Sequence, residues 1–430
     1  MSAAGVQSSP EARANDRQPH SASSGRRLRI FFVCLRVPFP PDRGDKITTF
    51  NLVRHLSQTN DVHVFCLGDP SADADNVQGL GRYVSAVTAV PLSRVYDKLR
   101  GIKALLTGTP LSIALRNEPG LHRAVASAFH RHRPDLMIAY SSNTAQFVPE
   151  SSSVPLLMYF GDLDSMKWSA YAARTPFPLN WVYRREARLL LQHERRIAGA
   201  SSHSLVCTEA ERDDFERLIP GAPVEVLQNG VDVEYFRPRG RGKRSGTMVF
   251  TGVMDYFPNV DGARWFCDEV LPLIQQAVPH ANLVICGRNP TRVVTRLADR
   301  PGVRVTGEVA DVRPCLDAAE ICVVPLRIAR GIQNKILEGM AMGLPCVASR
   351  AACQGLTIEA GSGVLAADDP RQFADHAIRL LRDEDFRSQM ARKAREAIET
   401  TYTWEAPLRQ LDRVVERLVA PAGPDRRRYG

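Results

Sequence analysis

Apolar residues recur along this chain in short continuous runs, separated by stretches in which they follow helical spacing. Continuous apolar runs of this length are typical of strands buried on both faces of a parallel sheet. In the first half of the chain, the runs predicted to be strands are Leu28–Leu35, Val62–Leu67, Val84–Val90, Leu136–Tyr140, Val154–Tyr159, Ser204–Cys207 and Val224–Leu227. Between the first two runs, the apolar positions from Ile47 to Leu56 predict a helix. Strands that alternate with helices predict α/β units and a mostly parallel sheet.

The same alternation begins again after residues 237–246, which contain five basic residues, three glycines and no acid. We interpret this segment as a solvated linker between two domains. The strands predicted beyond it are Thr247–Thr251, Leu283–Cys286, Val303–Val305, Ile321–Pro325 and Pro345–Ala348. A helix is predicted from about Val260 to Val278, and helical spacing returns from Pro370 to about Val419.

Composition limits the class of protein. With 430 residues, 44% of them hydrophobic and 24% charged, the chain has enough apolar material for more than one core, which excludes a single small module and a largely disordered protein. The net charge is +9, with 49 arginines and 7 lysines, a skew more typical of arginine-rich coding than of a nucleic-acid arm. Such a surface favours an acidic membrane face or a phosphorylated substrate.

The cysteines and the N-terminal residues indicate a location. Nine cysteines are scattered without a CxxC pair, and we interpret them as reduced core residues of a cytoplasmic protein. The predicted disordered tail 1–27 has no apolar stretch of the kind that an export signal needs. No stretch approaches the roughly 20 apolar residues of a membrane span.

The segment Val323–Ser349 carries a buried strand followed by a cluster of cations. Arg327 and Arg330 follow the strand, and Gly331 is expected to open a helix that contains Lys335. A helix N-terminus with free N–H groups beside arginine and lysine is a ready site for an anion. A diphosphate is the ligand that fits this arrangement.

Glu338 lies three residues after Lys335, on the same face of the expected helix. A carboxylate at that place is suited to accept two hydrogen bonds from the hydroxyls of a ribose. Together these groups predict a cradle for a nucleoside diphosphate. Taken in isolation, the two residues also fit a solvated pair on a helix surface.

This segment resembles the nucleotide-sugar motif of the retaining glycosyltransferase family 4, in which two glutamates separated by seven residues precede a small-residue helix and Gly-x-Pro-Val-Val-Ala. The second glutamate falls on Glu338, and the final stretch matches Gly343–Ala348. Further motifs resemble those of the family in the same order, namely Val226–Asp232, Phe250–Gly252, Ile285–Gly287 and Val305–Val309. The likeness spans about residues 28–420. It is closest to the sugar transferases of bacterial exopolysaccharide and PEP-CTERM gene clusters, judged by Arg36–Lys46, Tyr256–Asp261 and Arg327–Lys335.

The resemblance implies donor-binding roles for residues that lie mostly in the expected loops. They are Gly44, Gly252, Gly287, Val309, Arg327, Gly331, Ile332, Gln333, Asn334 and Glu338. Gly44 matches the glycine loop of the family, where a missing side chain lets backbone N–H groups approach a phosphate or sugar. The alternative for Gly44 is an ordinary turn glycine.

Two departures from the family pattern change the expected mechanism. The first glutamate of the family falls on Arg330, so a cation replaces an acid expected near the hydroxyls of the donor sugar. The usual arginine and lysine after the first C-terminal glycine are missing from Gly252–Tyr256. We therefore predict that neutralisation of the phosphates has moved to the start of the later helix, with Lys335 and Arg330 as catalytic residues.

The histidine that the family places near the donor sugar is also missing. After the strand Val154–Tyr159 the chain has Phe160–Ser165, in which Asp162 or Asp164 is the candidate substitute, and Asp162 is taken as the third catalytic residue. Asp162-x-Asp164 also resembles the metal-binding pair of the other main glycosyltransferase fold. Matches of three residues arise often by chance, so no metal site is predicted.

One expected helix combines Trp181 and leucines with many arginines. The arginines are Arg184, Arg185, Arg188, Arg195 and Arg196. They fit a solvated and partly paired face, a peripheral anchor to anionic lipid or a site for an acceptor phosphate. The sequence leaves these three interpretations open.

The resemblance implies the GT-B arrangement, an α/β fold in which two Rossmann-like domains with parallel sheets face a central cleft. Residues 28–236 would form the acceptor-side domain, residues 247–400 the nucleotide-sugar domain, and residues 401–430 a crossover helix and tail. The implied reaction is retaining transfer of a sugar from a nucleoside diphosphate sugar to a growing glycan.

The expected partners follow from that reaction. They are the nucleotide sugar, an exopolysaccharide or lipid-linked acceptor and an anionic membrane at the inner face, with no nucleic acid and no cofactor beyond the donor substrate. The alternatives are a catalytically impaired binding protein of the same shape, motivated by Arg330, and a sugar-nucleotide epimerase.

Overall fold

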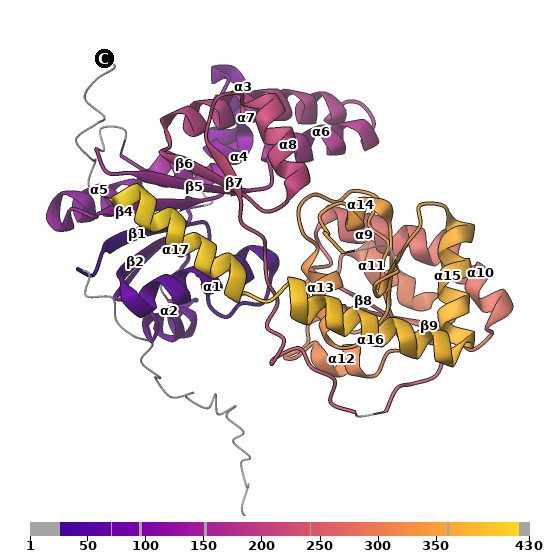
Figure 1. The fold of residues 1–430 in the computed structure, drawn as a ribbon. Helices are drawn as coiled ribbons and strands as arrows, with labels where there is room; N and C mark the ends of the chain where they lie inside the picture. The colour runs from indigo at the N-terminus through magenta and orange to yellow at the C-terminus, as the bar shows by residue number, and fades with distance from the viewer. Residues whose placement is uncertain are drawn as a thin grey trace, which may run out of the picture.

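The chain folds into two α/β domains, each with a parallel sheet between layers of helices (Figure 1). The computed structural model describes residues 26–420 except 70, 94–96, 150–152, 241 and 359–360, so nearly all of the predicted tail 1–27 lies outside the described residues. The two parallel sheets confirm the predicted pair of Rossmann-like domains.

The first domain contains a seven-stranded sheet in the order β3-β2-β1-β4-β5-β6-β7, and every adjacent pair is parallel. Its strands are β1 (Arg29–Cys34), β2 (Asp61–Leu67), β3 (Ala86–Val90), β4 (Leu136–Tyr140), β5 (Leu156–Gly161), β6 (His203–Val206) and β7 (Val224–Val226). Each overlaps a predicted apolar run. In β1 every residue from Ile30 to Cys34 is buried, because helices cover both faces of the sheet.

The helices of the first domain differ in how they begin. They are α1 (Gly44–Thr59), α2 (Ala74–Gly81), α3 (Asp97–Thr107), α4 (Leu111–Ala114), α5 (Pro119–His132), α6 (Asp164–Arg174), α7 (Leu179–Ala200) and α8 (Glu209–Leu218), with a 3₁₀ turn at Ser142–Phe147. The Thr208 side chain accepts a hydrogen bond from the Glu211 N–H at the start of α8. Pro119 occupies the first turn of α5, where its missing N–H costs nothing.

The second domain contains a six-stranded parallel sheet in the order β10-β9-β8-β11-β12-β13. Its strands are β8 (Thr247–Thr251), β9 (Asn282–Cys286), β10 (Val303–Val305), β11 (Ile321–Val324), β12 (Cys346–Ala348) and β13 (Val364–Ala366). Its helices are α9 (Phe257–Trp265), α10 (Leu271–Ala277), α11 (Arg292–Arg296), α12 (Arg313–Asp317), α13 (Asn334–Ala341), α14 (Arg350–Cys353), α15 (Pro370–Arg382) and α16 (Glu384–Thr401), with a 3₁₀ turn at Leu297–Asp299. The short edge strand β13 was not predicted.

Two expected helical stretches are interrupted. Between α9 and α10 the chain makes a π-helical turn at Phe266–Val270, next to Pro272, which has no N–H to continue the regular ladder. The stretch predicted to be helical from Pro370 to about Val419 consists of three helices. The Asp383 side chain accepts a hydrogen bond from the Phe386 N–H and starts α16 anew.

The chain passes between the domains twice, and the two passages lie side by side. In the first, the Val231 N–H donates to the Tyr402 carbonyl of the second at 2.7 Å. A side chain at Gly230 would meet the Trp404 backbone at 2.7 Å, so only glycine fits there. The second passage leads into α17 (Glu405–Val419), which returns to the first domain and packs beside α1 (Figure 1).

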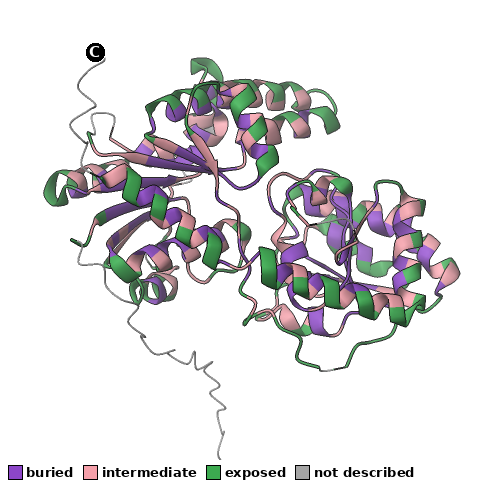
Figure 2. Cartoon of the chain, viewed as in Figure 1, coloured by how far each residue is buried: buried purple, intermediate pink, exposed green. Residues whose placement is uncertain are grey.

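The two cores are separate. One cluster of buried side chains fills the second domain, and three fill the first, where Leu411, Val414 and Val415 of α17 complete the core beneath α1. Figure 2 shows the buried residues along both sheets and the exposed residues on the outer faces of the helices. The strand order reverses between β1 and β4 and between β8 and β11, and ligands of open parallel sheets bind at the carboxyl ends of strands near such places.

Candidate active site

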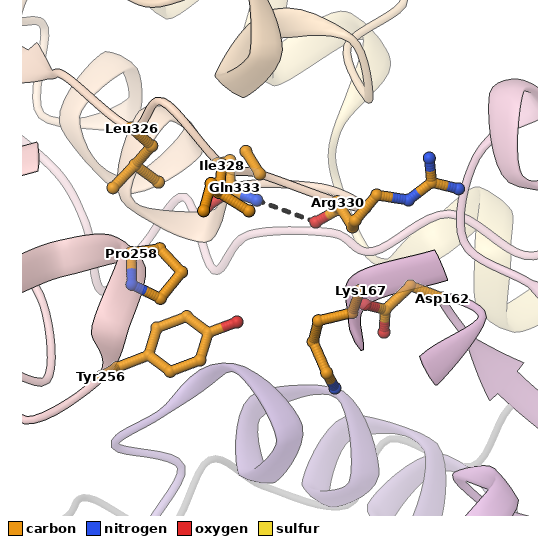
Figure 3. Close-up of a pocket in the computed structure, with 9 residues that line it drawn as sticks. Asp162, Lys167, Tyr256, Pro258, Leu326, Ile328, Arg330 and Gln333 are labelled. Atoms are coloured by element: carbon orange, nitrogen blue, oxygen red, sulfur yellow. Dashed lines mark hydrogen bonds between the residues drawn. The ribbon is translucent and has the colours of Figure 1, made fainter. Parts of the chain in front are cut away.

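Loops from the carboxyl ends of both sheets meet in a pocket between the domains (Figure 3). The pocket is open to solvent, and the empty space in and directly in front of it amounts to about 290 Å³. The first domain contributes Asp162 and Lys167, and the second contributes Tyr256, Pro258, Leu326, Ile328, Ala329, Arg330 and Gln333. Arg330, Gln333 and Asp162 therefore line one pocket. The sequence placed all three in loops that follow strands, where a site between the domains is expected.

The loop after β11 makes a tight turn before the helix that follows it. Gly331 has φ +62°, a left-handed conformation that favours glycine, and Gln333 Nε2 donates to the Arg330 carbonyl at 2.9 Å across the turn. The expectation that Gly331 opens the helix was wrong, because α13 begins at Asn334. The reason is that the positive φ of Gly331 is incompatible with a right-handed helix.

The same turn packs closely against the first domain. A side chain at Gly331 would come within 3.0 Å of Cys207 Sγ and 3.9 Å of Asp162 Cβ. Ile332 is buried. The missing side chain at Gly331 thus sets the spacing between the domains at the pocket.

The N-termini of two helices face each other at the domain interface. A side chain built on Gly44, the first residue of α1, would lie 3.6 Å from Nδ2 of Asn334, the first residue of α13. Neither helix has a side-chain cap, so their first N–H groups are free to bind an anion. Within the described residues, Oδ1 of Asn334 is buried without a hydrogen-bond partner.

Lys335 is held in the first turn of α13 by neighbours from the second domain. Its Nζ donates to Asn259 Oδ1 at 2.6 Å and lies 5.1 Å from the centre of the Phe250 ring. Asn259 in turn donates to the Val253 carbonyl at 2.8 Å. Burial lowers the pKa of Lys335 to about 8, although Glu338 acts in the opposite direction.

Glu338 is half-buried, and no described residue donates a hydrogen bond to its carboxylate. Burial raises the pKa of Glu338 to about 7, against the effect of Lys335. The carboxylate is also close enough to raise the pKa of Tyr235, after burial and Asp311. The Glu338 carboxylate is therefore a half-buried hydrogen-bond acceptor, one turn inside a helix that has no side-chain cap. This differs from a solvated pair of Glu338 and Lys335 on the helix surface, which was the alternative that the sequence left open.

Two glycines of the predicted set touch each other beside Lys335. A side chain on Gly287 would meet the Gly252 carbonyl at 1.6 Å, and one on Gly252 would meet Asn259 Nδ2 at 2.7 Å. These glycines let the ends of β8 and β9 approach each other and leave room for Asn259. Val309 lies farther out, in the loop after β10, and packs on the edge of the second core.

Arg330 is engaged by two acids of the first domain. Its Nε lies 2.9 Å from Glu211 Oε1 and its Nη2 lies 2.6 Å from Asp214 Oδ2, both on α8. Burial acts to lower the pKa of Arg330, but Glu211 and Asp214 raise it overall. Figure 3 shows its side chain pointing away from Tyr256 and Pro258. The role of Arg330 toward a phosphate stays a prediction, and in this conformation its guanidinium joins the domains instead.

Arg327 is likewise paired. Its Nε lies 2.9 Å from Asp261 Oδ2, and Nη2 contacts the other oxygen of the same carboxylate on α9. The ion pair of Arg327 lies within the second domain, whereas Arg288 of the second domain pairs with Asp42 of the first at 2.6 Å. Arg288 directly follows Gly287, and the sequence reasoning did not single it out.

A polar network lies on the first-domain side of the pocket. Asp164 accepts hydrogen bonds from Ser142 Oγ at 2.8 Å and from Asn143 Nδ2 at 3.1 Å, and it contacts Lys167 Nζ. Burial acts against the charge of Lys167, but Asp164 and Asp162 raise its pKa. The Asp164 carboxylate is thus occupied by hydrogen bonds and an ion pair within the first domain, and Asp162 is the acid that lines the pocket.

Asp162 is the less engaged of the two acids. Among the described residues it forms no ion pair, and burial raises its pKa, against the effect of Lys167. Glu194 is near both acids. Burial raises the pKa of the Glu194 carboxyl to about 8, and its Oε1 accepts a hydrogen bond from the Ser165 N–H at 3.1 Å.

Lys167, Glu211 and Asp214 were missed by reasoning from the sequence. Each lies on the first or second turn of a helix that follows a strand, which is the only signal the sequence offers for them. The roles of Glu211 and Asp214 depend on their contact with Arg330, which is more than a hundred positions away in the chain.

In the part of the chain that the structure describes, no group of three or more histidine, cysteine or acidic side chains is arranged to hold a metal ion. Over the same residues, no helix is both long enough and apolar enough to span a bilayer. The nine cysteines are all free thiols.

Both halves of the chain match models of glycosyltransferase domains. Residues 44–235 match the model described as Glycosyltransferase Family 4, and residues 245–383 match the model described as Glycosyl transferases group 1.

Two curated relatives match about half of the chain. N-acetyl-alpha-D-glucosaminyl L-malate synthase of Bacillus anthracis is 33% identical over 229 residues, which cover 51% of this chain and 58% of that protein. GDP-mannose:cellobiosyl-diphosphopolyprenol alpha-mannosyltransferase of Xanthomonas oryzae pv. oryzae is 25% identical over 239 residues, which cover 51% and 59%. The match thus spans less than two thirds of either relative.

Solved structures share the fold over almost the whole chain. Sucrose-phosphate synthase from Thermosynechococcus elongatus has a TM-score of 0.69 at 15% identity and covers 92% of this chain and 100% of its own. Anabaena HepE in complex with UDP and glucose has a TM-score of 0.66 at 14% identity and covers 91% and 100%. Each domain of this chain thus matches a glycosyltransferase domain model, and the two domains together have the GT-B fold.

Proposed function

We propose that this protein transfers a sugar from a nucleoside diphosphate sugar to a hydroxyl of a growing glycan, with retention at the anomeric carbon. One observation carries the proposal. The uncapped N-termini of α1 and α13 face each other within contact distance, beside Lys335 and the unpaired carboxylate of Glu338. A diphosphate and its ribose are the ligand groups that this combination of donors and acceptor matches.

The donor would lie across the second-domain side of the interface. The N–H groups at the start of α13 and the ammonium of Lys335 would bind the diphosphate, and Gly44 would let the start of α1 approach it. Glu338 would accept hydrogen bonds from the ribose hydroxyls. Gly252, Gly287 and Val309 would line the path to the base, and Ile332, Gln333 and Asn334 would hold the turn that faces the phosphates.

The sugar would occupy the pocket beyond the diphosphate. Asp162 projects into that space opposite Tyr256 (Figure 3), and its raised pKa suits a carboxyl that donates or accepts a hydrogen bond with a sugar hydroxyl. Asp162 would thus take the place of the histidine that the family has near the donor sugar. Arg330 supports the pocket by joining α8 to the turn, and Arg327 supports it through Asp261 on α9.

Retention needs no covalent intermediate with the protein if attack and departure occur on the same face. The acceptor oxygen forms its bond to the anomeric carbon while the bond to the phosphate oxygen breaks, and the acceptor proton passes to that departing oxygen. The negative charge that grows on the diphosphate is stabilised by Lys335 and the two helix N-termini. One donor of this kind accounts for roughly 2.7–4 kcal/mol of the barrier.

The names of the relatives support a nucleotide sugar as donor and a lipid-linked glycan as acceptor. One relative is named for GDP-mannose and a diphosphopolyprenol, and one structural neighbour was solved with UDP and glucose. We infer that this chain acts at the inner membrane face on an exopolysaccharide acceptor, with no metal cofactor.

The test is a screen of nucleotide sugars by thermal shift, followed by measurement of nucleoside diphosphate release with and without a lipid-linked glycan. A ligand at 100 times its dissociation constant stabilises the fold by about 2.7 kcal/mol. Release that requires acceptor, with the anomeric configuration retained in the product, supports the proposal. Binding without release would indicate an impaired binding protein, and donor turnover without acceptor would indicate an epimerase. Either result would overturn transfer as the function.

A further inference from the structure

Large apolar side chains are concentrated on one outer surface of the first domain. Twelve such side chains are exposed in the described part of the chain, and seven of them lie on α3, on the start of α7 or just before α7. We call these seven the apolar ridge, and they are Leu99, Ile102, Leu105, Leu106, Phe177, Leu179 and Trp181. Leu106 is 83% exposed and Phe177 is 81% exposed. Keeping such large apolar side chains in water is unfavourable in free energy.

The two parts of the ridge are fixed to each other. Nη2 of Arg185 on α7 donates to the carbonyls of Ala104 at 2.6 Å and Leu105 at 3.2 Å at the end of α3. Trp181 precedes Arg185 by four residues and so lies on the same helix face. The segment after α3 is held in turn by Glu186, which accepts from the Leu111 N–H at 2.7 Å. Figure 1 shows α3 and α7 together on the outer edge of the first domain.

The surroundings of the ridge are cationic. Asp97 is the first residue of α3, and the chain from there to Asn117 contains no further acid. Residues 165–193 contain only Glu186, which is buried against α4. The exposed cations in these two stretches are Lys103, Arg174, Arg184 and Arg188. An apolar strip with a tryptophan, flanked mainly by basic side chains, complements a surface that is both apolar and anionic.

We propose that the apolar ridge inserts into an anionic lipid bilayer, with the surrounding arginines and lysine against the lipid phosphates. This rests on the proposed function, because it gives the lipid-linked acceptor a fixed approach to the pocket. Helix α6 begins beside the pocket with Lys167 and ends just before Phe177. Its 11 residues span about 16 Å at 1.5 Å per residue, so a glycan of a few sugars reaches from the bilayer to the pocket.

The test uses the full chain and vesicles of two compositions, phosphatidylcholine alone and phosphatidylcholine mixed with phosphatidylglycerol, in a co-sedimentation assay. Wild-type protein should bind the anionic vesicles and lose affinity as salt rises. The variant Leu106→Ser/Phe177→Ser should bind at least about tenfold more weakly, because two exposed apolar side chains no longer enter the lipid. The variant Arg184→Gln/Arg188→Gln should lose about fivefold per arginine on anionic vesicles only, from about 1 kcal/mol for each charge.

A matched control comes from α11, where Val293 and Arg296 are exposed on the second domain. The variant Val293→Ser/Arg296→Gln should bind vesicles like the wild type. Nucleotide affinity, measured by calorimetry without vesicles, should stay unchanged in all three variants, which separates failure of this proposal from failure of the proposed function. Equal binding of the ridge variant and the control would overturn the proposal. So would a dimer in sedimentation velocity that the ridge variant abolishes, because a second copy would then cover the ridge.

Discussion

The two sides of the pocket are built in different ways. On the second-domain side, the groups around the predicted diphosphate site come from one stretch of chain, the turn after β11 and the start of α13, with support from Asn259. On the first-domain side, Asp162, Lys167 and Glu211 come from separate connections after β5 and β6. Nucleotide recognition is therefore local in sequence, whereas the sugar and acceptor side depends on how distant elements pack. Variants on the two sides should fail differently.

The largest effect is expected from Arg330→Glu. The new carboxylate would face Glu211 and Asp214, and breaking such a partly buried pair costs at most roughly 3–5 kcal/mol, the range for fully buried pairs. Sugar transfer should fall by two orders of magnitude or more, in a steady-state assay of nucleoside diphosphate release. Full activity would mean that Arg330 only fills the vacant place of the family's acid.

The control for this change is Arg350→Glu, which breaks an exposed pair with Asp368 in the same domain and should cost little. The variant Glu211→Gln/Asp214→Asn then separates two roles of Arg330. If the arginine only joins the domains, the double variant should lose as much activity as Arg330→Glu. If it also binds phosphate, donor affinity should survive in the double variant.

On the nucleotide side, Lys335→Met should slow turnover by roughly two orders of magnitude, the scale of losing one electrostatic donor. The fold should be retained, because the methionine keeps the packing of the lysine stem against Phe250. Lys393→Met on α16 is the matched control, since Lys393 is exposed and far along the chain from the turn. A fully active Lys335→Met enzyme would remove this cation from the mechanism.

Glu338→Ala should weaken nucleotide binding while leaving the melting temperature near that of the wild type. A lost hydrogen bond to a charged acceptor is worth roughly 1.5–3 kcal/mol, about 10- to 150-fold in affinity. Isothermal titration with the nucleoside diphosphate measures it. An unchanged affinity would exclude Glu338 from the ribose site.

A smaller effect is expected from pH. The Glu338 carboxylate must be ionised to accept from the ribose, and with its pKa raised to about 7 by burial, affinity should fall as the pH drops below 7. Lys335 must be charged, and with its pKa lowered to about 8 by burial, affinity should also fall as the pH rises above 8. Glu338→Gln should remove the acid limb of this bell-shaped profile and leave the alkaline limb, and a profile unchanged by that variant would contradict the assignment.

No effect is expected from chelation. The cation at the diphosphate is a lysine, supported by two helix N-termini, so activity should survive EDTA. Loss of activity that Mg²⁺ or Mn²⁺ restores would indicate that Asp162 and Asp164 are metal ligands. It would contradict the proposal that Asp162 contacts the sugar and that no metal takes part.

The sequence predicted the fold well for a physical reason. Parallel strands buried on both faces leave continuous apolar runs such as Ile30–Cys34, which are recognisable without knowledge of the tertiary structure. The prediction failed for the edge strand β13 and at Gly331, where a positive φ delays the start of α13. Both failures concern backbone geometry that residue types do not encode uniquely.

The candidate site was predictable only on one side. Lys335 and Glu338 share a helix turn, so their spacing shows that they lie together. The pairing of Arg330 with Glu211 and Asp214 joins residues more than a hundred positions apart, and no local pattern reports it. The choice between Asp162 and Asp164 likewise depended on Ser142, Asn143 and Lys167, which engage Asp164 and leave Asp162 toward the pocket.

Helix α17 also sets the order in which the protein matures on the ribosome. The core beneath α1 is closed by Leu411, Val414 and Val415, which are synthesised about 180 residues after the last strand of that sheet. At the usual rate of roughly 5–20 residues per second, that core stays open for about 10–40 s while the second domain is made. The first domain is thus the first to be translated and the last to be completed. Until α17 is made, the apolar surface that it later covers is the surface that nascent-chain chaperones would have to shield.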